Sequence, residues 1–174
     1  QRGRAGVHAS GWGNLLMPKL RRVHFASIGW PDARLSPLSL DLADDLGGAT
    51  DSVLWLRNGG GKSSILNLFF STFRPGLSDF LGRAVEGQRR HLADYVAADD
   101  SAFVLTEWEL DAPSTDKREA RTLVVGQSLE WRDRVKSADP SRLHRRFFSF
   151  FTDGALTWSA IPLQGLGEQP CTTQ

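Results

Sequence analysis

Cysteine, methionine and long apolar runs are nearly absent from this sequence. Cys171 is the only cysteine among 174 residues, so no internal disulfide can form, which fits a reducing cytosol. No apolar run approaches the roughly 20 residues that span a bilayer. The first residues, 1–16, lack the apolar centre of a signal peptide. We therefore expect a cytoplasmic protein without membrane contact.

An excess of charge is also missing. The chain has 21 basic and 20 acidic residues, a formal net charge of +1. This balance does not by itself point to nucleic acid, so any DNA contact would need a local basic patch. The histidines His8, His24, His91 and His144 lack the spacing of metal ligands. The remaining composition, 40% hydrophobic and 24% charged, is that of a globular domain with a core.

The two ends of the chain differ from its middle. Met17 is the only methionine, and the residues before it are glycine-rich and without pattern. We expect residues 1–16 to be a disordered upstream extension and Met17 to be the natural start. Residues 165–174 end without a clear structural terminus, so the sequence resembles a fragment.

The middle of the chain contains the most informative stretch, DSVLWLRNGGGKSSILNLFFSTF, at residues 51–73. Ser52 to Leu56 is a short apolar run that predicts a central parallel strand buried on both faces. A glycine-rich loop follows, and after it Leu66, Phe69, Phe70 and Phe73 recur at helical spacing. We expect this helix to be buried on most sides.

The loop between strand and helix has the chemistry of a phosphate site. Its residues are Asn58, Gly59, Gly60, Gly61, Lys62, Ser63 and Ser64. Successive glycines let backbone N–H groups surround one anion, and the helix directs its positive end to the same place. Lys62 is suited to the outer phosphates of ATP, and the Ser63 hydroxyl to Mg²⁺.

One position departs from the P-loop pattern G-x-x-x-x-G-K-[ST]. Leu56 stands where that pattern has its first glycine, although Gly61, Lys62 and Ser63 fit. The competing interpretation is a glycine-rich turn that happens to precede Lys-Ser. The strand–loop–helix context favours the P-loop.

The rest of the sequence predicts strands with one short helix. The predicted strands are residues 19–28, 38–42, 102–110, 120–131, 145–151 and 155–161, and the short helix covers about residues 92–96. Residues 29–32 predict a turn, and the last four strands predict two antiparallel hairpins.

In this order of elements, and above all in the stretch Asn58 to Ser64, the chain resembles the N-terminal lobe of an ABC-type ATPase head of the SMC class, including its MukB-like condensin relatives. The resemblance covers roughly residues 17–131. It implies an α/β P-loop NTPase fold with a mixed sheet and an antiparallel β subdomain. Residues 17–174 would be the N-terminal half of such a head.

The resemblance also implies cofactors and partners. ATP and Mg²⁺ would bind at residues 58–64, with Lys62 as the catalytic residue. Hydrolysis would need a C-terminal lobe of the same chain and a second head, so this fragment alone would be inactive. DNA, kleisin-like subunits and a nucleoid location are implied by the family as well.

Two other functions stay open. A small self-contained P-loop kinase fits the length, but the strand order and the lack of a Walker B aspartate argue against it; Phe103 to Glu107 is the nearest imitation. A nucleotide-binding interaction module that never hydrolyses ATP is the third interpretation.

Several side chains have two interpretations each. Arg89 and Arg90 could approach phosphate or DNA, or form a solvated basic turn. Trp30 could lie near the base of the nucleotide, although a core or surface role is more usual. Gln127 and Gln164 lack support as the family's Q-loop glutamine, and Phe147 to Phe151 fits a sheet core better than a base-stacking platform.

Overall fold

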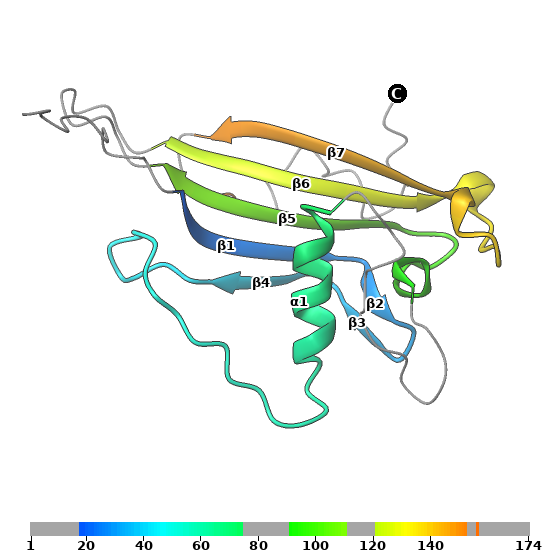
Figure 1. The fold of residues 1–174 in the computed structure, drawn as a ribbon, viewed down its shortest axis with the longest axis horizontal. Helices are drawn as coiled ribbons and strands as arrows, with labels where there is room; N and C mark the ends of the chain where they lie inside the picture. The colour runs from blue at the N-terminus through cyan, green and yellow to red at the C-terminus, as the bar shows by residue number, and fades with distance from the viewer. Residues whose placement is uncertain (1–17, 75–90, 111–120, 153–155, 157–174) are drawn as a thin grey trace, which may run out of the picture.

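The computed structural model describes residues 18–74, 91–110, 121–152 and 156. These residues form a five-stranded sheet in the order β4-β1-β5-β6-β7, with α1 lying across one face (Figure 1). The sheet strands are β1 (Lys19–Ala26), β4 (Leu38–Asp41), β5 (Ser101–Leu110), β6 (Arg121–Trp131) and β7 (Leu143–Thr152). Every strand pair in this sheet is antiparallel.

The shorter elements connect and cover the sheet. They are β2 (Ile28–Trp30), β3 (Ala33–Leu35), α1 (Lys62–Ser71) and the 3₁₀ turns η1 (Leu92–Tyr95), η2 (Arg132–Arg134) and η3 (Pro140–Arg142). The predicted first strand is confirmed but interrupted, because Ser27 takes a left-handed φ of 51° between β1 and β2. The sequence did not predict β3, and Gly29 and Trp30 belong to β2 instead of the predicted turn.

The hairpin of β5 and β6 was predicted and is confirmed. Its register places Leu105 opposite Gly126 and Phe103 opposite Ser128. Gly126 is required there, because a Cβ at this position would lie 2.7 Å from the Phe148 ring on β7. The predicted strand at residues 145–151 is also present as part of β7, which pairs with β6. Its predicted hairpin partner, residues 155–161, lies outside the described residues except for Leu156.

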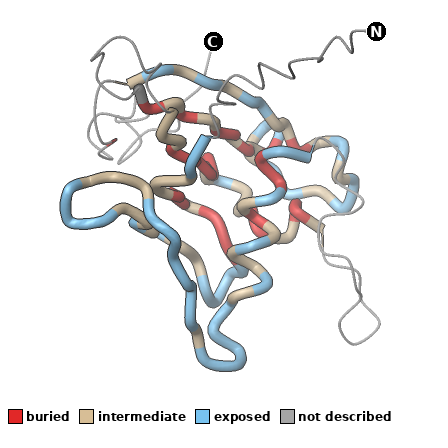
Figure 2. The backbone as a smooth tube through the Cα atoms, turned by 60° about the vertical axis from the view of Figure 1, so that its left-hand side comes forward, coloured by how far each residue is buried: buried red, intermediate tan, exposed pale blue. Residues whose placement is uncertain are grey.

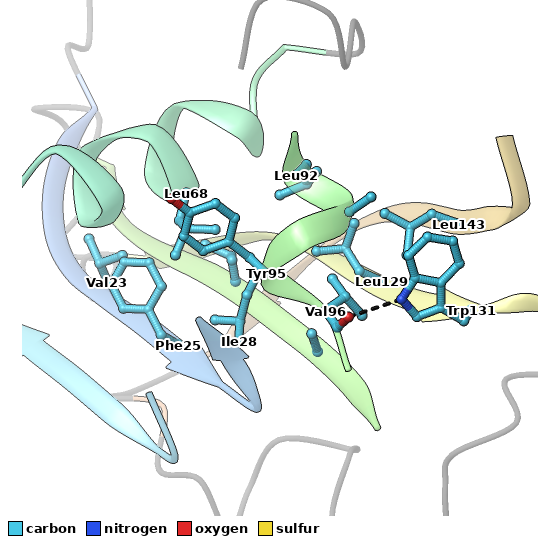
Figure 3. Packing of buried hydrophobic residues seen from close by; sticks show 13 residues of the cluster. Val23, Phe25, Ile28, Leu68, Leu92, Tyr95, Val96, Leu129, Trp131 and Leu143 are labelled. Atoms are coloured by element: carbon cyan, nitrogen blue, oxygen red, sulfur yellow. Dashed lines mark hydrogen bonds between the residues drawn. The ribbon is translucent and has the colours of Figure 1, made fainter. Parts of the chain in front are cut away.

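The main core lies between the sheet and α1. Phe25, Leu129 and Trp131 from the strands pack with Leu68 from α1 and Tyr95 from η1, and all are at most 2% exposed (Figure 3). The indole Nε1 of Trp131 donates to the Val96 carbonyl at 3.0 Å, so the one polar atom of this side chain is satisfied. A smaller apolar cluster consists of Phe103, Leu105, Val124 and Leu156.

A buried polar group links three strands. His24 Nε2 lies 2.6 Å from Glu107 Oε1, and His24 Nδ1 lies 2.7 Å from Ser39 Oγ. His24 is 2% exposed and Glu107 is 0% exposed. Arg22 approaches the second carboxylate oxygen at 3.6 Å and also pairs with Asp41 at 2.8 Å. Charges this deep are tolerated only in such paired arrangements.

The predicted buried strand at Ser52 to Leu56 is wrong. Residues 51–57 form no strand and are largely exposed, with Val53 at 92% and Trp55 at 83%. No described strand runs beside them, so the apolar run has neither a pairing partner nor a cover. Residues 51–61, called the limb from here on, belong to the segment that descends from β4 to α1 in Figure 1, and they are exposed except for the partly buried Leu56 (Figure 2).

Two further expectations need correction. The mixed sheet was wrong for the described residues, whose sheet is antiparallel throughout, although a mixed α/β fold is confirmed. The helix was predicted over about the right residues, but it is not buried on most sides. Leu66, Phe70 and Phe73 are 49%, 52% and 43% exposed, because only one side of α1 meets the sheet.

Candidate phosphate-binding loop

The loop before α1 has a backbone that only glycine adopts without strain. Gly59 has φ of 78° and Gly61 has φ of 84°, both in the left-handed region. A Cβ on either residue would meet no atom within 4 Å, so the space beside them is open. Gly60 is needed for a different reason, because a Cβ there would lie 2.9 Å from the Arg57 carbonyl.

The first turn of α1 leaves its amides available. The helix begins at Lys62 after Gly61, and the first backbone bond runs from the Ile65 N–H to the Gly61 carbonyl at 2.9 Å. Within the described residues, the N–H groups of Gly61, Lys62, Ser63 and Ser64 donate no backbone hydrogen bond. No acidic residue occupies the first turn and no side chain caps it. The positive end of the helix is therefore not neutralised by its own sequence.

Lys62 folds back over the loop. Its ammonium donates to the carbonyl of Leu56, and to that of Arg57 at 3.1 Å. Both acceptors are neutral, and no carboxylate pairs with this ammonium in the described part of the chain. The cation is thus held beside the glycines by contacts that a phosphate oxygen could replace.

The remaining predicted loop residues lie together but differ in exposure. Asn58 and Ser63 are exposed, so the Ser63 hydroxyl can reach a ligand at the helix start. Ser64 is partly buried, and its hydroxyl lies 3.5 Å from the Tyr95 hydroxyl. Among the residues described, no three His, Cys, Asp or Glu side chains come together as a metal site. A magnesium ion here would rest on Ser63 and on the phosphate oxygens themselves.

Aromatic rings extend from the loop toward the β2–β3 hairpin. The Tyr95 ring packs edge-on against Trp30, with centroids 6.0 Å apart and an interplanar angle of 70°. Trp30 is 44% exposed. Tyr95 thus links Trp30 to Ser64 in the first turn of α1. Trp30 is a partly exposed aromatic residue, in line with the core or surface role that the sequence favoured, and its proximity to a nucleotide base stays a prediction.

The other weighed residues fall elsewhere. Gln127 is fully buried on β6 and donates to Ser71 and Thr72 at the far end of α1, so it does not line the loop. Phe147 and Phe151 are 48% and 57% exposed on β7, whereas Phe148 and Phe150 pack against the smaller core cluster. Arg89, Arg90, Gln164 and residues 1–16 lie outside the described residues.

Sequence reasoning missed the way in which α1 is held. Arg145, on β7, donates to the Gln127 Oε1 at 2.7 Å and to the Ser71 carbonyl. The sequence held one indirect sign of this contact: no basic residue lies in the last turn of α1. The negative C-terminal end of a helix is stabilised by a cation, and where the helix has none of its own a basic residue from another element can supply it. The sequence does not say which residue does so.

Comparisons with known proteins add no relative. No protein-family model, no curated protein and no solved structure matches this chain. None of the helices in the described ranges could reach across a lipid bilayer.

Proposed function

We propose that this chain is the ATP-binding half of an SMC-like, DNA-associated ABC ATPase head. The observation that carries the proposal is the start of α1. There, within the described residues, two left-handed glycines with open space beside them precede backbone amides of residues 61–64 that have no backbone partner, and the Lys62 ammonium pairs only with neutral carbonyls of the same loop. This combination suits the phosphates of a nucleotide, because amides and a cation can replace the water around an anion.

The chain's own residues would then divide the work. The amides of Gly61 to Ser64 bind the inner phosphates, and Lys62 turns from the carbonyls of Leu56 and Arg57 toward the β- and γ-phosphates. The Ser63 hydroxyl would hold Mg²⁺, which would neutralise phosphate charge when bound. Among the described residues, no carboxylate pairs with Lys62 and no acidic residue lies in the first turn of α1, so hydrolysis would need an acid from another lobe to orient the attacking water.

The exposed limb supports in particular the proposal that this chain is only one half of an ATPase head. Val53 and Trp55 are strongly apolar and open to solvent, and the outer side of α1 exposes Leu66 and Phe70. Apolar surface of this kind marks a contact site in soluble proteins. A C-terminal lobe that pairs with residues 51–57 and covers α1 would bury all four side chains.

Nucleotide titration of the 174-residue chain tests the proposal. We expect weak ATP binding in the presence of Mg²⁺, read from the fluorescence of exposed Trp55 and Trp30, and essentially no turnover. Lys62→Ala should abolish binding, whereas Lys136→Ala, which removes an exposed lysine on the β6–β7 connection, should leave it unchanged. Equal affinity in the Lys62→Ala variant would reject the phosphate site.

The assay also separates the alternatives. Rapid phosphoryl transfer to a small acceptor by the isolated chain would favour the kinase. Tight binding without turnover, even after the rest of a head is supplied, would favour the non-hydrolysing module. DNA contact is tested by filter binding across a salt series, since phosphate contacts weaken steeply with salt.

A further inference from the structure

The helix that begins at the loop is anchored mainly at its other end. In α1, Leu68 and Ser71 are buried, and Thr72 just beyond is 3% exposed. By contrast, Ser63 is exposed and Leu66 is half exposed near the start. Near the start, the Lys62 ammonium bonds to carbonyls of its own loop, Ile65 packs partly buried against the core, and the polar contact to another element is the long one of 3.5 Å between Ser64 and Tyr95. The direction of α1 is therefore set at its C-terminal turn.

A polar cluster from two strands holds that turn. The Gln127 amide Nε2 donates to Ser71 Oγ at 2.5 Å and to Thr72 Oγ1 at 3.3 Å, while its Oε1 accepts from Arg145 Nε at 2.7 Å. The Arg145 guanidinium also donates to the Ser71 carbonyl, one of those that a helix end leaves without an internal partner. This cluster joins β6 and β7 to α1 across more than 50 residues of sequence.

Burying the charged guanidinium of Arg145 costs desolvation free energy, which points to a specific role for this residue. It is only partly exposed, and burial lowers the pKa of its guanidinium to about 10. The stem packs so that the guanidinium carbon lies 4.5 Å from the centre of the Phe147 ring. Since α1 has no basic residue in its last turn, Arg145 is the cation that complements the negative end of the helix.

Small changes at this anchor are amplified at the loop. A helix of 10 residues is about 15 Å long, so a tilt of about 5° at the C-terminal turn moves the first turn by roughly 1 Å. A displacement of that size can cost about 100-fold in the rate of a reaction that depends on geometry, and the contacts of amides and an ammonium with a bound phosphate depend on geometry in the same way.

We infer that Arg145 is a positioning residue for the phosphate-binding loop: by fixing the C-terminal turn of α1 to β6 and β7, it sets the direction in which the first turn of α1 and Lys62 meet a phosphate. The inference rests on the proposed function for its ligand. Arg145, on β7, would then affect nucleotide affinity without touching the nucleotide.

Substitution of Arg145 tests the inference in the 174-residue chain. Arg145→Met keeps about the stem length and removes the charge and the hydrogen bonds to Gln127 and Ser71. Arg145→Lys restores a charge, and Arg146→Met is the matched control on the opposite face of β7. At a temperature where circular dichroism shows every variant folded, we expect Arg145→Met to weaken ATP binding by about tenfold or more, Arg145→Lys to recover part of it, and Arg146→Met to stay within about twofold.

Amide hydrogen exchange without nucleotide gives a second readout. Arg145→Met should speed exchange throughout α1, including residues 65–67 near the loop, relative to wild type and Arg146→Met. If exchange changes only in the last turn, or if ATP affinity in the folded variant equals that of wild type, the positioning role is rejected. If wild type binds no ATP at all, the proposed function fails instead, and the exchange result still decides whether Arg145 sets the direction of α1.

Discussion

The sheet and the limb that leads to α1 contrast in almost every physical respect. Strands β1, β5 and β6 bury their apolar side chains on both faces and pair along their whole length. Residues 51–61 instead have little pairing and stay exposed, even though Val53, Leu54 and Trp55 are as apolar as a core strand (Figure 2). Stability is thus concentrated in the antiparallel sheet, and the candidate site in a region that stabilises little by itself.

A pair of tryptophans should show the contrast most strongly. Trp131 is fully buried with its indole bonded to Val96, whereas Trp55 is 83% exposed. Trp131→Ala should lower the free energy of unfolding by about 3–5 kcal/mol, because it leaves a large cavity. Trp55→Ala should change it by less than about 0.5 kcal/mol. Urea unfolding followed by circular dichroism measures both, and a comparable loss in the two variants would contradict the division between sheet and limb.

The buried pair on the other face should come next. Glu107→Gln keeps the shape of the side chain but removes the charge that faces His24 and Arg22. We expect a loss of about 2 kcal/mol in the free energy of unfolding, because a charge-assisted bond in a buried site is weakened. Glu109→Gln on the same strand is the control, and its loss should be clearly smaller. If Glu107→Gln leaves the free energy of unfolding unchanged, the attraction between Glu107 and its partners only compensates for the cost of desolvating them.

Glycines separate the two regions in a different way. Gly126→Ala places a methyl group against the Phe148 ring and should destabilise the sheet by about 1–3 kcal/mol. Gly61→Ala meets open space, so its cost is the left-handed backbone alone, about 1 kcal/mol. Thermal unfolding of the two variants checks the order. A larger loss from Gly61→Ala would show that the loop contributes more to folding than its exposure suggests.

The smallest effect concerns pH at the edge of the sheet. Partial burial raises the pKa of Asp41, but the hydrogen bonds from Arg22 and the Ala43 amide, with the charges of Arg22 and Arg21, outweigh it and hold the pKa below its usual value. Because the folded pKa is depressed, Asp41 stabilises the fold above the pKa it has when unfolded. That contribution is lost as pH falls through the lower folded value.

The exposure of Asp41 limits this contribution, since its side chain is 55% accessible. Asp41→Asn should therefore cost less than about 1 kcal/mol at neutral pH and nothing at a pH below the folded pKa. Unfolding curves of both proteins at pH 7 and near pH 2 measure the difference. A gap that persists at the lower pH would assign the effect to packing instead of charge.

The sequence predicted the parts of the fold that local pattern determines. Alternating side chains gave β4 and the β5–β6 hairpin, and the Leu66–Phe73 spacing gave α1. The glycine loop before Lys62 was also found, because each glycine meets a local backbone requirement. The pairing of β7 with β6 was missed, because residues 132–142 connect these consecutive strands through two 3₁₀ turns instead of a short hairpin loop.

The failures share one cause. Ser52 to Leu56 has the composition of a central strand, but a strand needs a neighbour, and none of the described strands provides one. The contact of Arg145 with the end of α1 could not be predicted from the sequence either, because Arg145 meets Ser71 only after the sheet has formed. Local chemistry therefore located the candidate loop, while tertiary contacts decide how that loop is held.

Amide hydrogen exchange upon addition of Mg-ATP shows directly whether a nucleotide binds at the start of α1. We predict slower exchange in peptides that cover residues 58–65, with β5 and β6 unchanged, and loss of that protection in Lys62→Ala. Protection confined to other segments, or none at ATP concentrations that saturate the tryptophan signal, would contradict a nucleotide bound at the start of α1.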